Sequence, residues 1–136
     1  MAFLDVTLTL ASPGATGTTA TSEDSNLSLT VTDTLTVSAP MRGPSQIVAT
    51  TTGSSNIIQP DTSGATYYLY VKHTGTSDGS SATTENLGVE LTGDVPFAVL
   101  APDEFCFVPV GGGSFGVQLQ AASGTVVAEF AWFKKS

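Results

Sequence analysis

The stretch Thr66-Tyr67-Tyr68-Leu69-Tyr70-Val71-Lys72-His73 carries the strongest β-strand signal in the chain, because it is rich in aromatic and β-branched residues. Successive side chains of a strand point to opposite faces, so Leu69 and its odd-numbered neighbours share one face while Tyr68 and Tyr70 share the other. In an antiparallel sheet one face usually packs on the core and the other meets water. Here both faces are apolar, which predicts that loops or another subunit cover the second one.

The closing stretch of the chain, residues 125–133, repeats this pattern. Phe130 and Trp132 share one face of the expected strand, and Phe133 lies on the other. Tyrosine and tryptophan are enriched in the cores of protein interfaces. Burying each large side chain contributes about 1.5–3 kcal/mol, so a handful can outweigh the entropy lost on association. We therefore predict a homo-oligomer, with the candidate interface residues Tyr68, Tyr70, Phe130, Trp132, Phe133, Leu4 and Val6.

An N-terminal strand is expected over residues 3–10, where leucine and valine alternate with aspartate and threonine. Residues 11–26 are small and polar and contain no large apolar side chain. We favour a long loop there, and the alternative is an arm that docks on a neighbouring subunit. The chain thus divides into residues 1–26, an N-terminal strand with a Ser/Thr/Gly-rich linker and possible docking arm, and residues 27–136, a β-sandwich domain.

The remaining strands are recognised by the same alternation and by the turns between them. Residues 27–39 keep a period of two interrupted at Asp33, which predicts a long strand bent near Asp33 or two short strands. Residues 40–44, which hold two prolines, are expected to end this segment. Pro102 and Asp103 suit the centre of a type I turn. Further strands are expected at residues 46–51, 57–58, 87–91, 97–100, 105–108 and 115–120. The pattern predicts an all-β fold, an antiparallel β-sandwich or jelly-roll-like barrel of about eight to ten short strands.

Composition excludes several classes of function. The chain has 136 residues with 4 Lys+Arg against 12 Asp+Glu, a formal net charge of −8. Such a charge repels a phosphate backbone, so no nucleic acid partner is expected. No apolar run reaches the roughly 18 residues of a membrane span, and the N-terminus lacks the pattern of a secretory signal, so no membrane association is expected. One cysteine allows no intrachain disulfide.

Residues capable of catalysis or metal binding are sparse. His73 is the only histidine; we interpret it as a strand-end residue hydrogen-bonded to a loop, and an active site with Asp78 and Ser80 is the alternative. Cys106 lies between two phenylalanines and behaves as a small hydrophobe. The acidic residues are dispersed over loops, two of which could still converge on a calcium ion. We predict no enzyme, no catalytic or metal-ligating residues and no cofactor.

A family likeness rests mainly on the second half of the chain. It is carried by an extended aromatic strand, a Pro-acidic turn, a Phe-x-Phe-x-Pro segment and a closing aromatic strand, at residues 67–75, 86–90, 100–109, 117–121 and 125–133. In this order the motifs resemble small β-sandwich structural proteins of tailed bacteriophages, including those of cyanobacterial viruses. The resemblance covers roughly residues 66–134, about half of the chain.

That resemblance implies a non-catalytic virion component, assembled in the host cytoplasm, that is present in many copies and commonly trimeric. As a capsid decoration or cement protein it would bind the major capsid protein, a role that we place slightly ahead. As a tail, baseplate or fibre component it would instead expose the loop at residues 74–86 to host glycans. An alternative outside this class is a lectin-like module in which Tyr67, Tyr68, Tyr70 or Trp132 stacks on sugar rings.

Overall fold

The computed structural model describes residues 2–11, 28–52, 55–59, 64–93, 96–111 and 116–136. These residues form nine strands in two antiparallel sheets and no helix, which confirms the all-β prediction and is consistent with a β-sandwich. The sheet orders are β1-β2-β9-β4-β7 and β3-β8-β5-β6. The expected linker at residues 12–26 lies outside the described residues.

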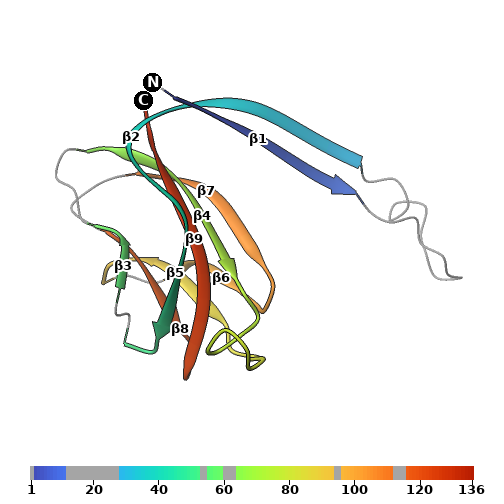
Figure 1. Cartoon of the computed structure of the whole chain (residues 1–136), viewed down its shortest axis with the longest axis vertical. Coiled ribbons are helices and arrows are strands. Elements are labelled where there is room, and N and C mark those ends of the chain that lie inside the picture. Colours follow the sequence, from blue (N-terminus) through green and yellow to red (C-terminus); the bar gives the residue numbers. More distant parts are fainter. Residues whose placement is uncertain (1, 12–27, 53–54, 60–63, 94–95, 112–115) are drawn as a thin grey trace, which may run out of the picture. The chain divides into compact units, whose positions relative to one another are not determined.

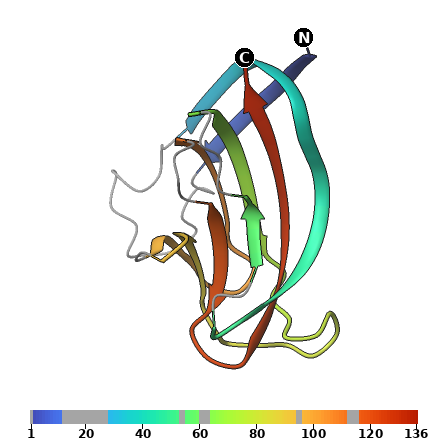
Figure 2. The same ribbon diagram turned by 90° about the vertical axis from the view of Figure 1, so that its left-hand side faces the viewer.

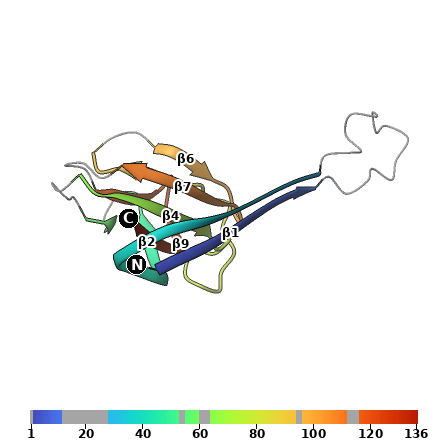
Figure 3. The ribbon, with the colours of Figure 1, turned by 90° about the horizontal axis from the view of Figure 1, so that it is seen from above.

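The chain divides into two compact units, residues 1–37 and 38–136. In the first unit β1 (Ala2–Ala11) pairs antiparallel with the first part of β2 (Ser28–Thr50), from Ala2↔Val37 to Ala11↔Ser28 without a register shift. The two strands run side by side in Figures 1 and 3. We call this two-stranded ribbon, residues 2–11 with 28–37, the arm.

The expected end of the second strand at residues 40–44 is wrong. β2 continues through both prolines to Thr50 and includes the short strand expected at residues 46–51. Proline holds φ near about −65°, a value that extended chain accommodates, so it does not by itself end a strand. The strand is continuous at Asp33, which pairs in register with Val6, so residues 28–39 belong to one long strand and not to two short ones.

The second unit contains the other strands. Their bounds are β3 (Ser55–Ile58), β4 (Thr66–His73), β5 (Leu87–Leu91), β6 (Pro96–Leu100), β7 (Phe105–Gly111), β8 (Val117–Ala121) and β9 (Thr125–Lys135). β4 lies between β7 and β9 in its sheet, and Figures 1 and 2 show β4 (green) beside β9 (red). The predicted bounds of β4 and β5 are confirmed. β7 runs past Pro109, which an edge strand tolerates.

The core of the second unit lies between its sheets. Leu69 and Val71 of β4 and Leu87 and Val89 of β5 are completely buried, and Phe130 of β9 is only 2% exposed. Alternation places these side chains on the inner faces, where burial of each contributes about 1.5–3 kcal/mol. This packing fixes which side of β4 and β9 remains available to other molecules.

The turn between β6 and β7 differs from the sequence prediction. The Glu104 N–H donates to the Ala101 carbonyl over 3.0 Å, which closes a turn with Pro102 and Asp103 at its centre. Asp103 has a φ of 69°, and a positive φ at the third position is typical of a type II turn and not of the predicted type I. Aspartate is among the few non-glycine residues that tolerate this conformation.

Candidate interaction surface

The outer side of the five-stranded sheet carries a continuous group of aromatic rings. Tyr68 and Tyr70 of β4 point away from the core because they alternate with Leu69 and its neighbours. The rings of Tyr68 and Phe107 are stacked, with centroids 6.0 Å apart and an interplanar angle of 10°. The Tyr70 and Phe105 centroids lie 6.5 Å apart. We call this surface the aromatic face, and its members are Tyr68, Tyr70, Phe105, Phe107 and Phe133.

The aromatic face is open to solvent. Phe105 is 59% exposed, and the other four rings are half-buried. On the inner side of the same strands, by contrast, Leu69 and Val71 have no exposed surface. The aromatic face therefore has the composition of an interface core and the exposure of a free surface.

Three polar groups border the aromatic face. The Tyr70 hydroxyl donates to Glu129 Oε1 over 3.2 Å. Burial, followed by the negative charge and hydrogen bond of Glu129, raises the pKa of Tyr70. The Lys135 ammonium nitrogen lies 5.0 Å from the centroid of the Tyr68 ring, a cation–π arrangement. Lys72 shares this side of the sheet, since it pairs in register with Phe105 on one side and Glu129 on the other.

The structure separates the predicted interface residues of β9. Phe133 lies on the aromatic face, in register with Tyr68. Phe130 is in the core and Trp132 lies on the same inner face, where its ring meets Tyr67 edge to face with centroids 5.5 Å apart. The Trp132 Nε1–H is buried and has no hydrogen-bond partner. Tyr67 is 6% exposed, and the rings of Tyr67 and Trp132 both line a hollow of about 370 Å³.

Sequence reasoning missed Phe105 and Phe107. Their alternation with Cys106 was visible, but nothing local indicates that β7 pairs with β4 and brings Phe107 opposite Tyr70. Cys106 points to the core side, as predicted, and burial raises the pKa of its thiol. The missing signal is the pairing register between segments that are distant in sequence.

Leu4 and Val6 lie on the arm. Directly opposed residues of an antiparallel pair share a face, so Leu4 faces Leu35 and Leu8 faces Val31 on one side of the ribbon. We call this side the apolar ladder; it comprises Leu4, Val6, Leu8, Leu10, Leu29, Val31 and Leu35, with Asp33 among them. The other side carries mainly threonines, and Thr34 Oγ1 donates to Asp5 Oδ1 over 2.8 Å.

The surroundings of His73 indicate a structural role for this residue. It is completely buried, its Nδ1 accepts the Gly75 N–H over 2.9 Å, and its Nε2 is 2.8 Å from the Glu85 carbonyl oxygen. Because Nδ1 accepts, Nε2 carries the proton and donates to Glu85. These bonds fasten both ends of the loop at residues 74–86, which confirms that His73 is a strand-end residue hydrogen-bonded to a loop.

The proposed partners of His73 in an active site are engaged within the loop itself. Asp78 Oδ1 accepts the backbone N–H groups of Ser80 and Ser81 over 2.9 and 2.6 Å. These hydrogen bonds hold the pKa of Asp78 well below its usual range. The loop also docks on β9, since the Val127 N–H donates to the Thr76 carbonyl over 2.8 Å. Hydrogen bonds thus hold the loop in shape and fasten it to the sandwich.

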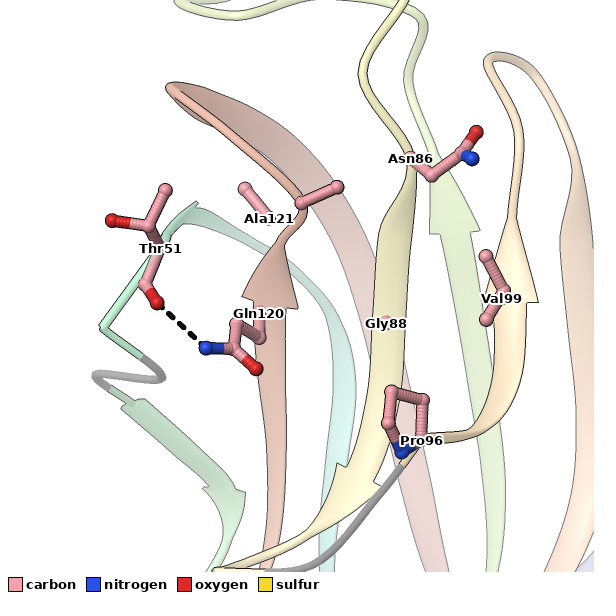
Figure 4. A pocket seen from close by; sticks show the side chains of 8 residues that line it. Thr51, Asn86, Gly88, Pro96, Val99, Gln120 and Ala121 are labelled. Carbon is pink, nitrogen blue, oxygen red and sulfur yellow. Dashed lines mark hydrogen bonds between the residues drawn. The ribbon is translucent and has the colours of Figure 1, made fainter.

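A hollow of about 230 Å³ lies on the outer side of the four-stranded sheet. Figure 4 shows its lining around Gly88, between Val99 and Gln120. The Pro96 ring lies close to Gly88, since a Cβ there would be 3.1 Å from Pro96 Cγ. Gln120 Nε2 donates to the Thr51 carbonyl over 2.6 Å at its edge. Neutral side chains and backbone line this hollow, and none of the lining residues is an acid, a base or a cysteine.

Within the described ranges, no group of three or more His, Cys, Asp or Glu residues is placed to hold a metal ion. The same part of the chain contains no helix of the length and apolarity needed to cross a membrane. Comparison with protein-family models gives no match, and no curated protein matches the sequence. The likeness to bacteriophage structural proteins therefore stays a prediction from the sequence motifs.

Proposed function

We propose that this chain is a non-enzymatic structural protein of a virion, a capsid decoration or cement protein that acts by assembling with copies of itself and with other virion proteins. The observation that carries the proposal is the aromatic face, with Phe105 59% exposed at its edge. Rigid aromatic side chains lose little entropy when they are buried and contribute most of the binding energy of many interfaces.

Charge supports a place on the outside of a particle. A net charge of −8 is unfavourable beside packaged nucleic acid and is tolerated on the outer surface of a shell. The bacteriophage class itself rests on the resemblance of residues 66–134 and on nothing else.

A tail, baseplate or fibre component is the second candidate within the same class. It is favoured by the loop at residues 74–86, which reaches solvent at Asp78 and Ser80 yet is held in shape by hydrogen bonds to β9. A rigid exposed loop is a common means of contacting a partner.

The assembly part of the proposal is tested by measuring the molar mass of the full chain by light scattering across concentrations from about 1 to 100 µM, a range typical of specific association. We expect the wild-type chain to form an oligomer and the double variant, Tyr70→Thr with Phe105→Thr, to be a monomer. The matched control is Phe97→Thr, because Phe97 is a 45% exposed phenylalanine outside the aromatic face. A monomer throughout the range contradicts the proposal.

The location is tested separately. Mass spectrometry should detect this chain in purified particles from the source of the gene. Immunogold labelling of the chain should mark the particle heads. Label on tails selects the second candidate. Particles that lack the chain contradict a virion role altogether.

A further inference from the structure

We propose that the arm is a docking element whose occupant is a second copy of this chain, and that its apolar ladder seats on the aromatic face of that copy. The inference rests on the proposed function, because it names the partner and the surfaces through which assembly takes place. Four observations carry it: the exposure of the ladder, the distribution of charge, the size of the surfaces and the chemistry of the competing surfaces.

The ladder is an apolar surface without cover along most of its length. Leu8, Leu10, Leu29 and Val31 are between 41% and 50% exposed. A two-stranded ribbon is at best marginally stable in water, since one layer of side chains buries little area. Docking of the ladder on another apolar surface would bury these side chains and also stabilise the ribbon.

Charge selects the receiving surface. Residues 1–37 contain no Lys or Arg, and Asp33 stands on the ladder itself, opposite Val6. All four basic residues belong to the second unit, and two of them, Lys72 and Lys135, border the aromatic face. An acidic ladder and a lysine-bordered aromatic face are complementary, which favours correct docking between copies that otherwise repel each other.

The area that would be buried also favours docking of the ladder on the aromatic face. Strands of ten residues are about 33 Å long, so the two strands of the arm present a face of about 300 Å². Two copies that exchange arms bury four such faces, about 1,200 Å² in total, which reaches the range of specific interfaces. Two arms packed ladder to ladder would bury only about half of this area. They would also bring two Asp33 carboxylates together without a basic residue.

The outer side of the four-stranded sheet is a poorer receiver. It carries the amides of Gln118 and Gln120 and the carboxylate of Glu90, which is 3% exposed and accepts from Gln118 Nε2. Covering the two amides with leucines costs their hydration, and Glu90 has the same charge as Asp33. The aromatic face also has a carboxylate at its border, that of Glu129, but the Tyr70 hydroxyl donates to this carboxylate and Lys72 is paired in register with Glu129.

The test uses two double variants of the full chain. The arm variant is Leu8→Thr with Val31→Thr, an exposed cross-strand pair on the ladder. The face variant is Tyr70→Thr with Phe105→Thr. Threonine keeps the β propensity of each position. Circular dichroism checks folding, and Phe105→Glu at a 59% exposed position replaces the face variant if the latter unfolds. The matched control is Thr7→Ser with Thr32→Ser, the pair on the opposite side of the arm.

Sedimentation velocity then measures association of each variant alone and of the two mixed at equal concentration. We expect the control to associate like the wild type, and each double variant alone to associate at least tenfold more weakly. We also expect the mixture to associate more strongly than either variant alone and more weakly than the wild type, because one of the two arm–face contacts of the dimer is intact in the mixed pair.

The remaining outcomes overturn the inference in distinguishable ways. A face variant that still associates like the wild type points to ladder-to-ladder packing. An arm variant that still associates shows that the aromatic faces bind each other or another surface, and it leaves the proposed function standing. A mixture that associates no more strongly than either variant alone excludes exchange of arm and face. A wild type that stays monomeric removes both the inference and the proposed assembly.

Discussion

The arm and the sandwich are built from the same sequence pattern and differ in what covers it. Leu8 on the arm and Leu69 on β4 both occupy the apolar side of an alternating strand. Leu69 is completely buried, whereas Leu8 is 41% exposed. Alternation therefore tells which side chains share a face, and only the pairing of sheets decides whether that face is a core or a surface. The contrast makes the sandwich the source of stability and the arm a candidate for intermolecular contact.

The first prediction sharpens this contrast in stability. Leu69→Ala should lower the free energy of unfolding by about 2–5 kcal/mol, because it leaves a cavity in a fully buried site. Leu8→Ala on the arm should cost less than about 1 kcal/mol in dilute, monomeric protein. Urea denaturation at low protein concentration measures both. Equal losses would mean that the arm is part of the same core.

The second prediction concerns the buried end of β4. His73→Leu fills the buried position with an apolar side chain but removes the hydrogen bonds to the Gly75 N–H and the Glu85 carbonyl. Each buried group left unpaired costs about 1–3 kcal/mol, so the loss of both bonds should cost about 2–6 kcal/mol. Urea denaturation measures it. Thr84→Leu, at an exposed position of the same loop, is the control and should change little. An unchanged stability in His73→Leu would show that the loop does not depend on this residue.

The third prediction tests the corrected turn. Asp103→Val should destabilise the sandwich by about 1–2 kcal/mol, since a β-branched residue is strained at a φ of 69°. Asp103→Asn should be nearly neutral, because asparagine tolerates this conformation as aspartate does. The shift in thermal unfolding midpoint separates the two variants. Similar midpoints would favour the type I turn that the sequence indicated.

The smallest expected effect is local and depends on pH. Hydrogen bonds from the backbone N–H groups of Ser81 and Ser80 hold the pKa of Asp78 below that of an ordinary aspartate. The stabilisation that Asp78 gives to its loop is therefore present above about pH 4 and is lost as the pH falls through the lowered pKa. The protection of the Ser81 amide, its observed hydrogen exchange rate compared with the intrinsic rate at the same pH, should decrease over that range. Asp78→Asn should remove this pH dependence. A pH dependence that persists in the variant would come from another titrating group.

The sequence predicted the fold class and the bounds of β4 and β5 because alternation with period two is a local signal. It indicated Tyr68, Tyr70 and Phe133 for the surface for the same reason. Phe130 could not be separated from Phe133 in this way, since alternation does not reveal which side of β9 faces the second sheet.

Non-local features were out of reach of the sequence. The pairing of Phe107 with Tyr70 depends on the register between β7 and β4, and the arm depends on pairing β1 with residues 28–37. The proline-containing stretch at residues 40–44 was misread because proline ends helices and central strands far more often than it continues a strand. Asp103 was assigned to the wrong turn because the Pro-Asp pair is compatible with more than one turn type.

The central claim, that the aromatic face is an interface between proteins, is tested most directly by hydroxyl-radical footprinting of the wild-type chain at low and high concentration. The account predicts that modification of Phe105 decreases on association while that of Phe97, similarly exposed outside the aromatic face, stays constant. Equal modification of Phe105 in the associated and dissociated protein would contradict it.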